Sequence, residues 1–109
     1  MVFAQHLEKG DPIVVSYGNH LVAGIFVGYG SVGNVNFYRP QALAYCKDLG
    51  KGRLPYKSYI NRTDQVSIAR IHLMDVDSGL QDTYLKALDY LKEKGVLWAN
   101  LSITQITGK

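Results

Sequence analysis

The sequence predicts a single, mostly β domain: a small barrel of five short strands with a helix after it. Three observations predict this fold. Short runs rich in β-branched and aromatic residues are separated by turn residues. Two glycines lie inside the second run, where glycine marks a bend or a bulge. The clearest helical periodicity begins only at Ser78. Because strongly bent strands let one ribbon serve both sides of a barrel, the glycines favour a barrel over a flat sheet.

Five runs carry the strand signal. The first is Ile13–Tyr17, and the Gly-Asn pair after it predicts a two-residue hairpin turn. The second is Leu21–Tyr29, in which Gly24 and Gly28 are the two internal glycines. The remaining predicted strands are Val35–Tyr38, Tyr56–Ile60 and Val66–Leu73.

Helices are expected on either side of this barrel and within it. A short N-terminal helix is predicted over Val2–Leu7, and another short one over Gln41–Cys46. Ser78–Lys94 is the clearest helix, because its apolar residues recur at helical spacing. Ser78 and Gln81 have capping-box spacing, and Gly95 suits the left-handed position after the helix. The segment Leu101–Ile106 is a candidate additional edge strand.

Length and composition restrict the class of protein. With 109 residues the chain fits one domain, divided into a barrel at residues 1–75 and a helix with its tail at 76–109. An apolar share of 47% with 19% charged residues excludes a disordered chain. One cysteine excludes a disulfide framework and a cysteine-only metal site. The apolar runs are too short to span a bilayer and the N-terminus lacks a basic region before an apolar stretch, so a cytoplasmic protein is expected.

The positive charge is concentrated in the middle of the chain. Between Arg39 and Arg70 there are seven basic and two acidic residues, which gives +5, whereas the rest of the chain carries −2. Four tyrosines lie among these charges and are able to stack on bases. This pattern is typical of a phosphate-bearing partner, with the basic segment Lys47–Arg62 as the expected contact. A solvated surface with extended lysines is the alternative interpretation.

Two motifs resemble those of a known family. Gly24, the Gly28-Tyr29 pair and Asn34 stand, without a gap, at the spacing of the first motif of the Sm-like family, which includes the bacterial Hfq proteins. Residues 56–60 read Tyr-Lys-Ser-Tyr-Ile and resemble the Tyr-Lys-His-x-Ile of Hfq, with Ser58 at the histidine position. The resemblance covers residues 2–38 and 55–73. The helix from Ser78 and the tail fall outside it.

The resemblance implies a five-stranded Sm-like (SH3-like) barrel, a ring-forming homo-oligomer and a ligand. In the family, the fourth strand of one subunit pairs with the fifth strand of the next, and a ring removes open strand edges. RNA or single-stranded DNA is the partner that the resemblance implies. No membrane, metal or cofactor is expected, since the apolar runs are short and no metal-ligand spacing stands in the sequence. The candidate nucleic-acid-binding residues carried over from the family motifs are Asn34, Lys57, Ser58, Asn61 and Arg62.

The chain departs from the family pattern in the first loop, where Gly30 replaces an aspartate and Val32 replaces the residue that stacks on a base. A structural or protein-interaction oligomer of the same fold, without nucleic acid, is therefore the alternative function. The sequence favours a non-catalytic protein over two enzyme interpretations. Cys46 with His6, His20 or His72 would make a nucleophile–base pair, but the thiol reads as a buried apolar group. A metal site at His72, Asp75 and Asp77 has no supporting ligand spacing.

Overall fold

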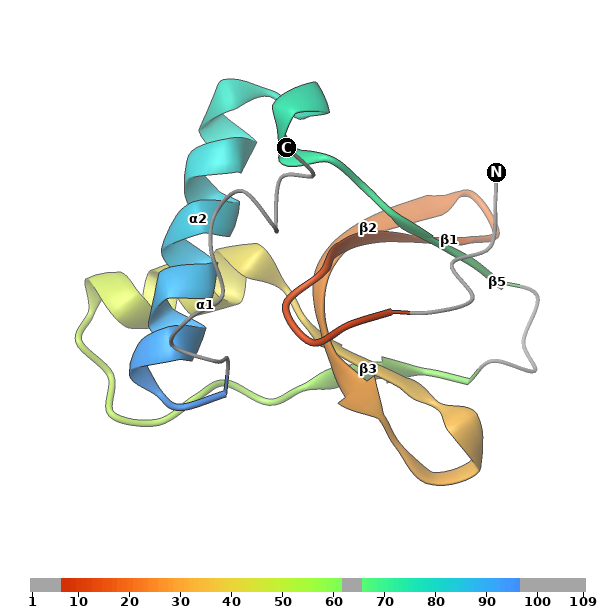
Figure 1. Ribbon diagram of the computed structural model, residues 1–109, viewed down its shortest axis with the longest axis horizontal. Coiled ribbons are helices and arrows are strands. Elements are labelled where there is room, and N and C mark those ends of the chain that lie inside the picture. The colour runs from red at the N-terminus through yellow and green to blue at the C-terminus, as the bar shows by residue number, and fades with distance from the viewer. Residues whose placement is uncertain (1–6, 62–65, 97–109) are drawn as a thin grey trace.

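The computed structural model describes residues 7–61 and 66–96 and contains one five-stranded antiparallel sheet (Figure 1). The strand order across the sheet is β4-β3-β2-β1-β5, so the chain forms two hairpins in sequence and β5 returns to the far side of β1. The strands are β1 (Pro12–Tyr17), β2 (His20–Tyr29), β3 (Val35–Tyr38), β4 (Ser58–Ile60) and β5 (Val66–Arg70). The first three lie where the sequence predicts them, and the hairpin between β1 and β2 is the predicted two-residue turn, with Gly18 at φ +54°.

The expected closed barrel is wrong for the described residues, which form an open, strongly curved sheet (Figure 1). β4 and β5 lie at opposite edges, and closure would require a ladder between them that the described strands do not make. The two strands are also shorter than predicted, because Tyr56 and Lys57 precede β4 and Leu73 belongs to a 3₁₀ turn, η2 (Leu73–Asp75), after β5. Short edge strands supply few hydrogen bonds for closing a barrel within one chain.

Apolar side chains fill both faces of the sheet. The concave face carries one cluster of buried residues: Leu7, Ile13, Val15, Phe26, Val35, Phe37 and Ile68. The convex face carries a second cluster, in which Ile25 and Tyr38 of the sheet pack against α1 (Pro40–Asp48) and α2 (Ser78–Glu93). The two helices lie together on that side of the molecule (Figure 1). α2, which follows the sheet in the chain, therefore completes the hydrophobic core on the convex face.

α1 is longer than the helix predicted at 41–46, because it begins at Pro40. Proline suits the first position of a helix, where its fixed φ is already helical and its missing N–H has no intrahelical partner. The same residue stops β3, so one proline both ends a strand and starts a helix. None of the helices in the described ranges is long and apolar enough to cross a membrane.

α2 confirms the predicted apolar stripe, since Tyr84, Leu88 and Leu91 are buried. Gly95 has φ +75° and follows the helix as expected. The predicted capping box is wrong. Asp77 is the N-cap residue and makes no side-chain cap, while Gln81 donates from Nε2 to the carbonyl of Val76, 2.6 Å away. The glutamine thus satisfies the carbonyl before the cap.

Two further predictions, the helix at residues 2–7 and the edge strand at 101–106, fall on residues 1–6 and 97–109, outside the described residues. Leu7, which is described, is not helical and belongs to the concave core. The Leu7–Gly10 segment is held by Asp11, whose Oδ2 accepts a hydrogen bond from the N–H of Glu8 at 2.7 Å.

The buried hydroxyl of Tyr84 predicts a loss of stability at alkaline pH. Its Oη donates to the carbonyl of Ile13 at 3.2 Å, and burial raises the pKa of Tyr84 to about 12. Because the folded state holds this proton more tightly, we expect the free energy of unfolding to fall by up to about 2–3 kcal/mol between the ordinary pKa of 10 and 12.

Tyr84→Phe should remove that part of the pH dependence, at a cost of about 1 kcal/mol near neutral pH for the lost hydrogen bond. Denaturant unfolding of both proteins, below pH 10 and near pH 12, measures the difference. An identical fall in the two proteins would assign the alkaline loss to other groups.

Candidate nucleic-acid interface

The structure separates the sequence-predicted site residues into two groups at opposite ends of the β3–β4 pair. The ladder runs from Val35 opposite Ile60 to Phe37 opposite Ser58. Asn34 and Asn61 therefore adjoin one end, and Lys57 and Ser58 the other. Lys57 and Asn61 are four residue steps apart along extended chain, which is about 13 Å at 3.3 Å per residue. Arg62 lies outside the described residues.

Asn34 carries a buried side-chain acceptor without a partner. Its Oδ1 is buried and makes no hydrogen bond to any of the described residues. Its backbone is fixed, because the carbonyl accepts from the N–H of Gly30 at 2.7 Å and closes the turn around η1 (Ser31–Gly33). An unsatisfied buried acceptor is costly, and because this oxygen is buried within the chain, a ligand or a second subunit does not reach it in this arrangement.

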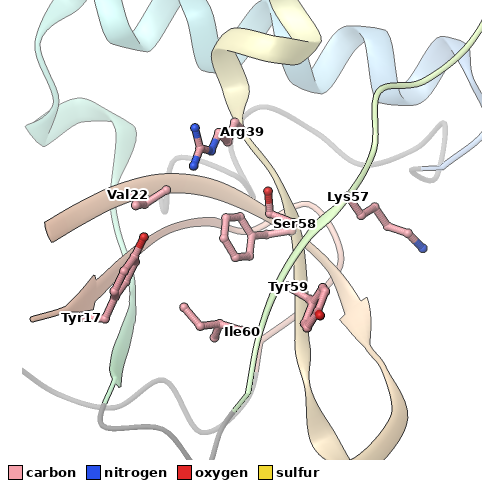
Figure 2. Close-up of a pocket in the computed structure, with 8 residues that line it drawn as sticks. Tyr17, Val22, Arg39, Lys57, Ser58, Tyr59 and Ile60 are labelled. Carbon is pink, nitrogen blue, oxygen red and sulfur yellow. The ribbon is translucent and has the colours of Figure 1, made fainter.

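The two residues of the second group point to different sides of the sheet. Ser58 is opposite Phe37 and so shares the concave face with it, whereas Lys57 points away from the other side chains shown (Figure 2). Strand alternation is the reason, since successive side chains point to opposite faces. Lys57 and Ser58 therefore approach a ligand from different sides, although both border the same hollow.

Beside Ser58 the open end of the concave core forms a hollow of about 300 Å³ (Figure 2). Sequence reasoning missed most of it, although alternation from Ile13 and Val15 places Tyr17 on the same face at the end of β1. No sequence pattern indicated that Arg39 belongs to the hollow, because its position depends on where β3 ends and α1 begins. The residues lining the hollow are Tyr17, Val22, Phe37, Arg39, Lys57, Ser58, Tyr59 and Ile60.

Part of the basic middle of the chain is neutralised within the fold. Lys47 of α1 lies 2.8 Å from Asp89 and 2.7 Å from Glu93 of α2, and hydrogen bonds to these two carboxylates raise the pKa of Lys47. Arg70 pairs with Asp11 at 2.8 Å. Burial nevertheless raises the pKa of Asp11, against the lowering effect of the Glu8 N–H and of Arg70. Lys47 is thus a poor phosphate contact, contrary to the expectation for the segment Lys47–Arg62.

Four other cations of the basic middle of the chain have no ion pair in the described structure, and exposed tyrosines lie near them in the sequence. No carboxylate in the described part of the chain pairs with the side chains of Arg39, Lys51, Arg53 or Lys57. Tyr56 lies among them and is fully exposed, and Tyr59 is 68% exposed. We call this set the basic strip: Arg39, Lys51, Arg53, Tyr56, Lys57 and Tyr59.

A buried tyrosine anchors the loop that carries Lys51 and Arg53 of the basic strip. Tyr90 of α2 is 2% exposed, and its Oη lies 2.6 Å from the carbonyl of Lys51 and 3.3 Å from that of Arg53. These contacts hold the backbone of the loop against the helix while the cationic side chains stay exposed. A fixed backbone lowers the ordering cost of binding.

Of the residues in the two enzyme interpretations, His6 lies outside the described residues. Cys46 is a free, buried residue of the core beneath α2, and His20 and His72 are exposed. Across residues 7–61 and 66–96 no three His, Cys, Asp or Glu side chains gather as metal ligands would. Comparison of the chain with protein-family models, with curated proteins and with solved structures found no match.

Proposed function

We propose that the protein is a non-catalytic, Sm-like oligomeric module that binds single-stranded RNA or DNA along the basic strip. The observation that carries the proposal is the combination of four cationic side chains that have no ion pair among the described residues with the exposed rings of Tyr56 and Tyr59. Proteins that bind single strands without sequence preference combine cations that follow the backbone with aromatic side chains on which bases stack.

The two open edges of the sheet support an assembly of the kind that the resemblance implies. The fourth and fifth strands are the two edges of the sheet, so each has a side without a neighbouring strand in the described structure. An edge strand that pairs with a different edge of the next copy makes a head-to-tail contact, which generates rings.

The same edges favour the second candidate function, an oligomeric protein-interaction module without nucleic acid. The departures at Gly30 and Val32 support it, because they remove an aspartate and a stacking residue of the family pattern. The two functions differ in their response to salt. Binding to phosphates weakens steeply as salt rises, whereas a protein-only assembly binds no oligonucleotide at any salt concentration.

Arg53→Ala combined with Lys57→Ala is expected to weaken the binding of an oligouridine and to flatten its salt dependence. For single strands each phosphate contact contributes about 0.7 to the slope of log affinity against log salt, so the slope should fall by about 1.4. Fluorescence anisotropy with labelled oligo-U and oligo-A at several salt concentrations measures this change.

Lys47→Ala is the matched control, because its charge is already neutralised by Asp89 and Glu93. It should leave affinity and slope as in the parent protein. No binding of either oligonucleotide at low salt would refute the nucleic-acid function. An equal loss of affinity in the control would move the contact surface away from the basic strip.

A further inference from the structure

The floor of the hollow beside Ser58 is apolar and is set by the register of the sheet. Val22 lies opposite the fully buried Val15, and Ile60 lies opposite Val35, so both side chains share the concave face with Phe37. Backbone ladders on β2 and β4 hold these positions. At about 300 Å³ the hollow is at the small end of ligand pockets, which suits one flat group rather than an extended ligand.

An aromatic wall stands at one side of this floor. Tyr17, the last residue of β1, faces across the hollow from β4 (Figure 2) and is 38% exposed. Its ring centroid is 5.6 Å from that of His20, at an interplanar angle of 42°. This tilted contact supports the ring from the hairpin without forming a parallel stack. A planar group placed on the floor would meet the tyrosine ring.

Two polar groups point into the same space. The hydroxyl of Ser58 is directed toward the side of the hollow where the guanidinium of Arg39 lies (Figure 2). Neither side chain has a hydrogen-bond partner among the described residues. Arg39 is the N-cap residue of α1, but its side chain makes no cap bond, so the guanidinium is available beside the positive end of the helix.

We propose that this hollow holds one base of a bound single strand, stacked on Tyr17, while Arg39 binds the adjoining phosphate. The inference rests on the proposed function and adds a base-holding site to it. An apolar floor and an aromatic wall recognise the flat face of a base, and Ser58 both donates to and accepts from its edge. An arginine fork matches the oxygens of a phosphate. Arg39, Lys57 and Tyr59 of the basic strip also line the hollow, so a strand bound by these three residues passes its mouth.

The test distinguishes binding of the base in the hollow from binding of the phosphate alone. The methyl signals of Val22 and Ile60 are followed by NMR while uridine or adenosine 5′-monophosphate is added, with ribose 5-phosphate as the probe that lacks a base. We expect the nucleotides to shift these signals and ribose 5-phosphate to leave them unchanged. Tyr17→Leu keeps an apolar side chain but removes the stack, and should weaken oligonucleotide binding about 5- to 150-fold.

Two further variants keep the test independent of folding. Ser58→Leu fills the hollow from its own floor and should abolish the nucleotide-induced shifts, with circular dichroism as in the parent protein. Tyr45→Leu removes an exposed ring of α1 that does not line the hollow and should leave oligonucleotide binding as it was.

The outcomes distinguish this inference from the proposed function. If oligonucleotides bind but the Val22 and Ile60 signals do not move and Tyr17→Leu binds as tightly, the inference is wrong and the basic strip alone carries binding. If nucleotides shift the signals while oligonucleotides do not bind, the hollow is a nucleotide site and the strand-binding function is wrong. If neither probe binds, both proposals are refuted.

Discussion

Tyr59→Pro is expected to convert the proposed oligomer into monomers that keep their fold. The reason is the direction of the Tyr59 backbone groups. The carbonyl of Asn34 accepts from Gly30, on the β2 side of β3, so by alternation the backbone groups of Val35 and Phe37 face β4. Their partners Ile60 and Ser58 therefore bond to β3, and the N–H and C=O of Tyr59 point to the open edge.

Proline at this position removes the one donor with which the middle of β4 can bind a second strand, while the bonds to β3 remain. Edge strands tolerate proline when the missing N–H would have faced outward. Light scattering should give several times the mass of one chain for the parent protein and 12.1 kDa for the variant.

Tyr59→Ala is the matched control, because it removes the ring and keeps the N–H, and it should remain oligomeric. If Tyr59→Pro stays oligomeric with an intact circular dichroism spectrum, subunits do not pair through β4. A monomeric parent protein would remove the ring assembly altogether.

Gly24→Ala is expected to destabilise the fold by about 1–3 kcal/mol, as overpacking of a filled core does. A Cβ at this position would lie 2.7 Å from Cδ2 of Phe37 and 3.3 Å from Cγ1 of Ile13. Phe37 is 4% exposed and Ile13 is fully buried, so neither side chain moves away freely. The Phe37 ring occupies the space that a side chain at position 24 would need. Urea unfolding measures the loss.

Gly79→Ala controls for the general effect of replacing glycine. A Cβ there meets no atom within 4 Å, and Gly79 lies in the first turn of α2, so this change should stabilise the protein by about 0.5–1 kcal/mol. The double variant Gly24→Ala, Phe37→Leu should lose less free energy of unfolding than the sum of the losses of the two single variants, because the smaller side chain relieves the clash. Strict additivity would show that the clash with Phe37 is not the cause.

The local elements of this protein are encoded in short stretches of sequence. β-branched runs separated by a two-residue turn determine β1 and β2, and the spacing of Tyr84, Leu88 and Leu91 determines α2. These patterns are local because side-chain direction repeats every 2.0 residues in a strand and every 3.6 in a helix. The weaker predictions concern the capping of α2 and the ends of β4 and β5, where contacts with distant residues decide which backbone groups are satisfied.

For the candidate site, the predicted strand Tyr56–Ile60 already places the side chains of Lys57 and Ser58 on opposite faces by alternation. Only the curvature of the sheet decides that the Ser58 face is the concave one. Tyr17 and Arg39 are 22 residues apart in the chain, and only the curvature of the sheet and the turn from β3 into α1 bring them to one hollow. Likewise, only helix packing decides that Lys47 faces Asp89 and Glu93 while Arg53 and Lys57 remain exposed. A sequence states which charges and rings exist, but the tertiary structure decides which of them are neutralised, because ion pairing and burial depend on distances between residues far apart in the chain.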